Sequence, residues 1–303
     1  LRTCCKMAAT RSAIGVVVVG VGIAGRVRIR DLRECTCGLE LKGFVSRREL
    51  EVPGVPQLTF KDALTSSDVK GIIICTEPAW HEEFIRQALE NGKHVLVEYP
   101  VALTSTATRD LYTQAADKNL VLHEENIGLL TESHQKLKEL AATKKLKTGT
   151  NSLVGNYNGW VEKLPLEGKP FLSNIAAIQS FYDVFGDLKA VGATLDINDT
   201  GVKFCGELEP KTGNQKLFIK GERHKERVQR AGSTIVEFED GEIFDSTAVK
   251  SAAPPGPKKP GLFMQDLEIF AAKVNGERTT EVDEITRCVR SIEIAEEAHK
   301  FLK

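Results

Sequence analysis

Short apolar runs alternate with amphipathic segments through the first 128 residues of the chain. Five of these runs are rich in Val, Ile and Leu and predict β-strands. Their nearly continuous apolar character is typical of strands that are buried on both faces of a parallel sheet. The predicted strands are Ile14–Gly20, Leu39–Ser46, Gly71–Thr76, His94–Glu98 and Leu120–Glu124.

Helical patterns separate the strands. In one of them, apolar residues recur at helical spacing and Asn91 and Gly92 provide a C-terminal stop. Since βαβ crossovers are right-handed, the alternation predicts a doubly wound α/β domain of the Rossmann type over residues 13–128. The predicted helices are Ala24–Glu34, Lys61–Thr65, His81–Asn91 and Thr104–Lys118.

The second half of the chain has a different pattern. After a predicted helix at Thr131–Lys145, segments such as KFCGELE, NQKLFIKG and STIVEFEDGEIFD alternate between apolar and polar residues. They predict an α+β domain over residues 129–303 with a largely antiparallel sheet. Ser251–Gly261 is a Pro-rich and Gly-rich linker, and two terminal helices, Leu262–Val274 and Val282–Leu302, are expected to dock on one of the sheets.

Composition limits the classes of function. The chain has 303 residues, 41% of them hydrophobic, and a net charge of −1, so no overall field attracts nucleic acid or a membrane surface. Seven scattered cysteines without a C-x-x-C pair favour a reducing, cytoplasmic location and no metal site. Residues 1–12 lack the apolar core of a signal peptide and are predicted to be a disordered extension.

A G-x-G-x-x-G motif follows the first predicted strand. Gly20 makes the tight turn, Gly22 lets the backbone approach a pyrophosphate, and Gly25 lets the next helix pack close to the strand. The backbone around Ile23 and Ala24 then opens the helix toward the phosphates. The motif therefore predicts a dinucleotide site.

The end of the second predicted strand indicates which dinucleotide binds. NAD-specific domains carry a carboxylate there, whereas this chain has Ser46, Arg47 and Arg48. Two guanidinium groups and a hydroxyl suit a 2′-phosphate, so NADPH is the preferred cofactor, and NADH stays open as a second one. A solvated arginine pair on a loop is the alternative interpretation.

The ends of the later strands are expected along the cofactor crevice. Thr76 and Glu77 should flank the nicotinamide ribose, and Glu98 and Tyr99 should lie near the nicotinamide ring. Glu125 follows the fifth strand. These side chains are the acid–base candidates that can be placed by topology.

Two further features of these strand ends can be interpreted from the sequence. The Tyr99–Pro100 bond is a candidate cis peptide. His81 opens a predicted helix and is interpreted as a helix N-terminal or surface group rather than as a catalyst.

The combined motifs resemble the glucose–fructose oxidoreductase, inositol dehydrogenase and rhizopine catabolism (Gfo/Idh/MocA) superfamily. Within it, GVVVVGVGIAG, GFVSRREL, GKHVLVEYP and VLHEE are similar to the bilin-reducing members. This resemblance implies NAD(P)H-dependent hydride transfer to the central methine carbon of biliverdin, an open tetrapyrrole, to give bilirubin in heme degradation. It assigns Ser46, Arg47 and Arg48 to the NADPH phosphate and Tyr99 to the catalytic cleft. The substrate would be a small molecule, and a monomer is slightly favoured.

The proton donor and the substrate contacts stay open at this level. Tyr99, Glu98 and Glu125 are candidate donors in that order, with bulk water as a rival, because an unperturbed tyrosine is a weak acid at neutral pH. The sequence departs from the bilin-reducing pattern at Ile23 and Ala177, where relatives carry arginine. Other basic residues could bind the substrate carboxylates, but the sequence does not place them: Arg26, Arg28, Arg223, Lys225, Lys258 and Lys259.

Two other classes of function remain as alternatives. One is a related NADPH oxidoreductase acting on a sugar or a dihydrodiol. Tyr99 stands where most sugar-oxidising members carry lysine, which disfavours this class. The other is a non-catalytic NADPH-binding paralogue, which the missing arginines keep open.

Overall fold

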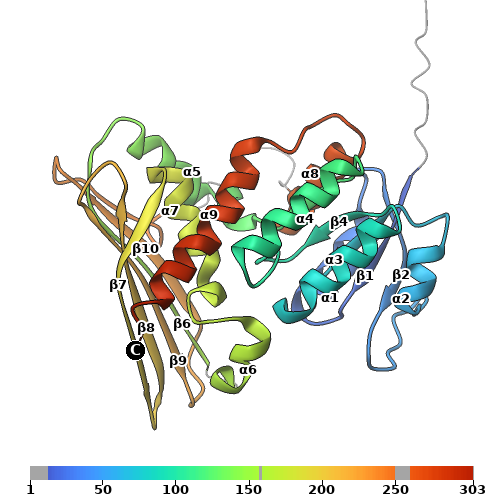
Figure 1. Cartoon of the computed structure of the whole chain (residues 1–303), viewed down its shortest axis with the longest axis horizontal. Helices are drawn as coiled ribbons and strands as arrows, with labels where there is room; N and C mark the ends of the chain where they lie inside the picture. The colour runs from blue at the N-terminus through green and yellow to red at the C-terminus, as the bar shows by residue number, and fades with distance from the viewer. Residues whose placement is uncertain (1–12, 157–158, 250–259, 303) are drawn as a thin grey trace, which may run out of the picture.

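The computed structural model describes residues 13–156, 159–249 and 260–302. The predicted extension at residues 1–12 lies outside this range, as do Lys258, Lys259 and most of the predicted linker. Figure 1 shows two bodies side by side, one built around a parallel sheet and the other around a broad sheet of long strands.

The first sheet is parallel throughout and has five strands in the order β2-β1-β3-β4-β5. This confirms the predicted doubly wound domain. The strand order reverses between β1 and β3, the point at which such sheets bind ligands at their carboxyl edge. The strands are β1 (Ile14–Val19), β2 (Leu39–Val45), β3 (Gly71–Ile74), β4 (His94–Val97) and β5 (Leu122–Glu124).

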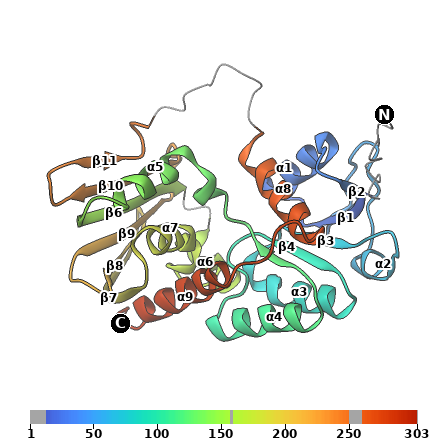
Figure 2. The same cartoon turned by 90° about the horizontal axis from the view of Figure 1, so that it is seen from above.

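Helices cover both faces of this sheet, as Figure 2 shows. The helices α3 (His81–Glu90) and α4 (Ser105–Asp117) pack on one face, and α1 (Ile23–Glu34) lies on the other. The short helix α2 (Phe60–Thr65) follows β2. The face with α1 is shared with α8 (Leu262–Val274), which returns from the far end of the chain.

The second sheet has six strands in the order β11-β10-β6-β9-β8-β7. Among the strands of this sheet in the described ranges, only β6 and β9 pair in parallel, so the prediction of a largely antiparallel sheet is confirmed. Strands β6 and β7 lie outside the segments whose alternation predicted strands. The strands are β6 (Leu146–Asn156), β7 (Leu188–Asn198), β8 (Gly201–Pro210), β9 (Lys216–His224), β10 (Ala231–Phe238) and β11 (Ile243–Asp245).

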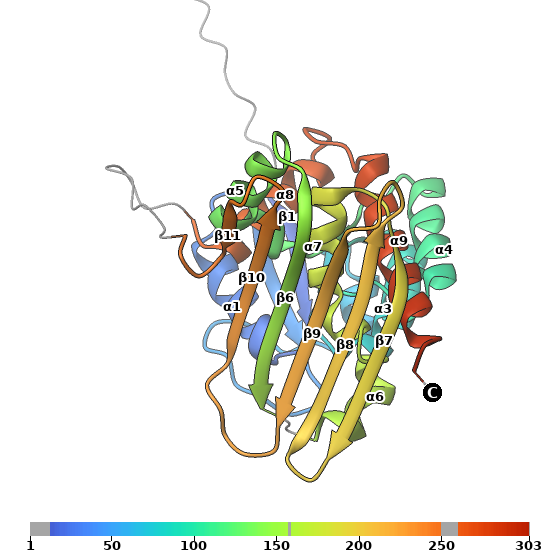
Figure 3. The same cartoon turned by 90° about the vertical axis from the view of Figure 1, so that its left-hand side faces the viewer.

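Helices cover one face of the second sheet, and its other face is bare in Figure 3. Phe181 of α7 belongs to the same buried apolar cluster as Leu217 of β9 and Phe238 of β10. The helices on this side are α5 (Glu132–Ala141), α6 (Trp160–Glu167), α7 (Ile175–Phe185) and α9 (Val282–His299). Short 3-10 turns follow β3 (η1, Pro78–Trp80) and β5 (η2, Ile127–Leu130) and precede α7 (η3, Leu172–Asn174).

The last two helices join the two bodies. Leu267 and Phe270 of α8 complete the core of the first sheet, whereas Ile292 of α9 lies in the core of the second. Cys288, also on α9, is buried against the first domain. Residues after 260 therefore contribute to both cores, and the boundary placed at residue 128 stays a prediction. None of the helices in the described ranges has the length and apolar character that a membrane crossing needs.

Candidate active site

The glycine loop between β1 and α1 has the geometry of a phosphate cradle. Gly20 has a φ of +91°, and a Cβ there would lie 2.6 Å from the Cys75 carbonyl oxygen. A Cβ on Gly25 would lie 1.9 Å from the Gly20 carbonyl oxygen, so both positions require glycine. A Cβ on Gly22 would meet nothing within 4 Å, which leaves open space above the start of α1.

Ile23 opens α1 at this loop, and its side chain is 90% exposed. No acidic side chain occupies the first turn of α1, so nothing on this turn opposes an anion. An apolar side chain donates no hydrogen bond, so the backbone amides of the loop must supply the phosphate contacts.

The arginine pair follows β2 at the edge of the sheet. Gln57 fixes this loop, because its Nε2 donates to the carbonyl oxygens of Ser46 and Arg48 at 3.0 and 2.9 Å. The Arg47 side chain is 80% exposed and lies 3.3 Å from a carboxylate oxygen of Glu77, which follows β3. The structure thus brings together predicted cofactor residues from two strand ends.

A buried ion cluster lies under the carboxyl ends of β4 and β5. Arg28 of α1 is fully buried, and its Nε and Nη2 each donate to Oε1 of Glu98 at 3.1 Å. Its Nη2 also donates to Asp266 of α8 at 2.6 Å, and its Nη1 donates to the Phe263 carbonyl oxygen at 3.1 Å. The expectation that Arg28 could be available to a substrate is therefore wrong, because all these contacts hold it inside the fold.

The cluster continues toward α9. Nε2 of His123 lies 2.9 Å from the second oxygen of Asp266, and its Nδ1 lies 3.0 Å from the Lys273 ammonium group. Lys273 pairs with Glu284. Burial raises the pKa of Glu284, but His123 and Lys273 outweigh this effect and lower it to about 2.

Glu98 and Glu125 both have raised pKa values. Burial is the main cause for Glu98, and the Arg28 guanidinium opposes it. Burial, with the charges of Glu98 and Asp266, raises the pKa of Glu125 to about 8. Its Oε1 accepts a hydrogen bond from the Ile127 amide at 2.8 Å, and its Oε2 is buried without a partner in the described structure.

Tyr99 lines two cavities. The Tyr99–Pro100 peptide is cis, as the sequence suggested. Burial, followed by the charges of Glu125 and Glu98, raises the pKa of the Tyr99 phenol to about 12. Tyr99 lines one cavity of about 290 Å³ against the second sheet and one of about 270 Å³ beside Thr76 and Glu77.

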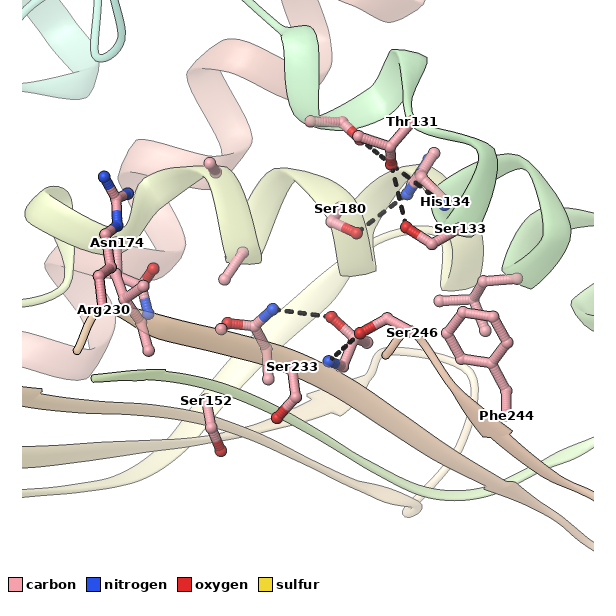
Figure 4. Close-up of a pocket in the computed structure, with 18 of the residues that line it drawn as sticks. Thr131, Ser133, His134, Ser152, Asn174, Ser180, Arg230, Ser233, Phe244 and Ser246 are labelled. Carbon is pink, nitrogen blue, oxygen red and sulfur yellow. Dashed lines mark hydrogen bonds between the residues drawn. The ribbon is translucent and has the colours of Figure 1, made fainter. Parts of the chain in front are cut away.

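The larger cavity lies between the second sheet and the helices α5 and α7, as Figure 4 shows. No Asp or Glu is present among its described lining residues. His134 on this wall bonds to Ser180 and Asp183, both at 3.0 Å. Most of the polar lining side chains carry hydroxyl groups: Tyr99, Thr131, Ser133, Ser152, Ser180, Ser233, Thr234 and Ser246.

His81 opens α3, as predicted, but the interpretation as a surface group is wrong. Its ring is fully buried, with Nδ1 2.7 Å from the Pro100 carbonyl oxygen and Nε2 3.0 Å from the Thr76 carbonyl oxygen. Burial lowers its pKa. His81 therefore ties together the turns that follow β3 and β4.

The sequence analysis missed Asp266, although α8 carries a signal for it. Asp266 follows Phe263 by three residues and precedes Phe270 by four, so it interrupts the apolar face of the helix. A carboxylate at such a position needs a buried partner. No group of three or more potential metal ligands occurs among the described residues.

Comparison with known proteins identifies the class. Residues 14–126 match the model of an oxidoreductase family with an NAD-binding Rossmann fold, named GFO_IDH_MocA. The chain is 36% identical to mouse biliverdin reductase A over 298 residues and 37% identical to the human protein over 299, covering 95% of each chain in both cases. The chain belongs to this family of oxidoreductases. Biliverdin reductase A is a full-length relative within it.

Solved structures share the whole fold. A biliverdin reductase from Synechocystis sp. PCC 6803, in complex with biliverdin and NADP+, has a TM-score of 0.76 at 21% identity and covers 95% of this chain and 99% of its own. A scyllo-inositol dehydrogenase from Lactobacillus casei with NAD(H) and scyllo-inositol has a TM-score of 0.75 at 15% identity, covering 96% and 97%. At these identities the likeness shows the fold alone.

Proposed function

We propose that this protein reduces biliverdin to bilirubin with NADPH. The observation that carries the proposal is the match to two mammalian biliverdin reductases A over 95% of both chains. The match extends over the second sheet, which forms a wall of the larger cavity beside Tyr99, and is not confined to the nucleotide-binding domain.

The residues of the first domain fit a nicotinamide cofactor. The open space above Gly22 and the start of α1 suit the pyrophosphate, and the exposed Arg47 and Arg48 suit a 2′-phosphate. NADPH is therefore the preferred cofactor and NADH the second. When bound, the cofactor supplies the hydride.

The two cavities that Tyr99 lines have apolar walls, which suit a flat, extended tetrapyrrole. Phe244 and Leu153 line the larger one, and Leu172 lines the smaller. Arg230 lines the larger cavity and Arg223 the smaller, and a cation in the lining of each supports the binding of an anionic substrate such as biliverdin.

Reduction adds a hydride to the central methine carbon and a proton to a pyrrole nitrogen. With a pKa of about 8, Glu125 is largely protonated at pH 7, and we assign it as the source of this proton because its charge acts on the Tyr99 phenol in the cavity wall. The raised pKa keeps the Tyr99 phenol protonated at neutral pH, which suits it to donate a hydrogen bond to the ligand. Glu98 is committed to Arg28, and we assign it the weaker catalytic role.

The direct test mixes the purified protein with NADPH and biliverdin and follows the change from the green biliverdin spectrum to the yellow bilirubin spectrum. Conversion that depends on protein and NADPH is expected. NADPH binding without any spectral conversion, at any pH from 5 to 9, would contradict the proposal and favour a non-catalytic NADPH-binding protein. Turnover of scyllo-inositol without bilin conversion would favour a sugar or polyol enzyme. The proposal also includes a cytoplasmic location and a monomer, and size-exclusion chromatography tests the oligomeric state.

A further inference from the structure

A buried amide without a partner lies at one end of the larger cavity. Asn174, the residue before α7, is 6% exposed, and its Nδ2 has no hydrogen-bond partner in the described structure. Its side chain does not cap the helix either. Because an unpaired buried amide group destabilises a fold by about 1–3 kcal/mol, a ligand that accepts its hydrogen bond would recover this energy.

A cation lies at the same end. Arg230, just before β10, lines the cavity together with Asn174, and Figure 4 draws both side chains toward the same end of the view, by the start of α7. Arg230 and Tyr99 line the same cavity, and the charge of Arg230 opposes the rise that burial causes in the pKa of the Tyr99 phenol. No described carboxylate forms an ion pair with Arg230.

The helix adds to the positive potential at this point. The first turn of α7 carries no acidic residue, so its positive end is not neutralised, and Ala176 and Ala177 leave room over it. The amide donor of Asn174, the guanidinium group of Arg230 and the N-terminus of α7 together favour the binding of a carboxylate.

We propose that Asn174 and Arg230 form a carboxylate-binding subsite that takes one propionate of the bilin. This inference rests on the proposed function, which supplies the ligand. The subsite holds the bilin against Tyr99 and makes the protein select the free acid over an esterified bilin.

The test measures binding of biliverdin and of biliverdin dimethyl ester, which lacks both carboxylates, by absorbance titration in the presence of NADP+ so that no turnover occurs. The wild-type protein should bind the acid more tightly than the ester. Arg230→Met should weaken acid binding about 10- to 100-fold and ester binding less than threefold. Arg227→Met, an exposed arginine of the same loop that does not line the cavity, is the matched control and should change neither.

Asn174 provides a second, independent pair of variants. Asn174→Leu should weaken acid binding about 5- to 20-fold without lowering the melting temperature, because it removes an unpaired donor. Asn174→Asp should weaken it further, since a second carboxylate repels the propionate. Equal losses for acid and ester, or no loss in Arg230→Met and Asn174→Leu, would overturn the subsite.

The outcomes separate the subsite from the reaction. If the wild-type protein selects the acid through these residues but does not reduce it, the proposed function fails and the subsite stands. If it reduces biliverdin with an acid-to-ester preference that neither variant changes, the subsite fails and the function stands. If neither bilin binds, both proposals fall.

Discussion

The buried cation Arg28 allows a quantitative prediction about stability. Replacing it by methionine keeps most of the side-chain volume but leaves Glu98 and Asp266 without the guanidinium that contacts both at 2.6–3.1 Å. Removing one partner of a buried ion pair destabilises a protein by about 3–5 kcal/mol, which is a large part of a typical total of about 5–15 kcal/mol. We therefore expect Arg28→Met to lower the free energy of unfolding by about 3–5 kcal/mol at pH 7.

The decrease in the free energy of unfolding caused by Arg28→Met should be larger at high pH than at low pH. Without Arg28, the pKa values of Glu98 and Asp266 rise in the folded state, so the folded protein binds more protons than the unfolded chain. The stability of the Arg28→Met variant is then greatest at low pH, and it falls as the pH rises through the raised pKa values of Glu98 and Asp266. The deficit of Arg28→Met relative to wild type should therefore be smaller at pH 5 than at pH 8 by about 1–2 kcal/mol, at about 1.36 kcal/mol for each unit of pKa shift.

Urea unfolding followed by circular dichroism at pH 5, 7 and 8 measures this difference. Arg26→Met, an exposed arginine on the same helix, is the control and should change stability by less than about 0.5 kcal/mol. The double variant Arg28→Met/Asp266→Asn should recover part of the loss, because it removes one of the two stranded carboxylates. A loss below about 1 kcal/mol for Arg28→Met, or one that is equal at pH 5 and pH 8, would refute this account of the cluster.

Four further predictions concern the cofactor and Glu125. Replacing both Arg47 and Arg48 by alanine should raise the KM for NADPH about 10- to 100-fold and that for NADH less than threefold, and equal increases would refute the phosphate assignment. Gly25→Ala should abolish NADPH binding in a fluorescence titration, because its Cβ would lie 1.9 Å from the Gly20 carbonyl oxygen, and normal binding would contradict the close packing of α1 against this turn. Wild-type kcat should fall above pH 8 as Glu125 ionises, whereas Glu125→Gln should be slow with no such decline, and matching pH profiles would exclude Glu125 as the proton source. The raised pKa of Glu125 also makes wild-type stability decline as the pH rises through about 8, and urea unfolding from pH 5 to 9 should show this decline reduced in Glu125→Gln.

The strands of the first sheet could be predicted because burial on both faces makes them continuously apolar. Strand β6 could not, although it lies inside the second sheet between β10 and β9. Its residues Asn151 and Ser152 line the larger cavity, and Gly149 packs against Leu217, so its sequence follows neither a simple alternation nor an apolar run. A strand that forms the wall of a cavity carries polar and small residues at positions where other strands carry apolar ones, so the hydrophobic pattern does not identify it.

Part of the candidate site could likewise be predicted from the sequence, and part could not. Topology alone places the ends of neighbouring parallel strands together, and for this reason Glu77, Glu98 and Tyr99 could be assigned to one edge from sequence. Arg28 looks like one of several solvated arginines on α1, and its partner Asp266 lies 238 residues further along the chain. Only the return of α8 to the first sheet brings the two together, and no local pattern predicts that docking.

The cluster also explains how two neighbouring carboxyl groups can have different roles. After burial, the charge of Glu98 is the largest cause that raises the pKa of Glu125, so an ionised Glu98 favours a protonated Glu125. Arg28 donates twice to Glu98, whereas Oε2 of Glu125 has no partner among the described residues. The guanidinium therefore favours the anion at Glu98, and that anion helps to keep the proton on Glu125. The distant Asp266 acts on both carboxyl groups, because its charge adds to the burial that raises the pKa of Glu98 and of Glu125, whereas the double contact with Arg28 is made by Glu98.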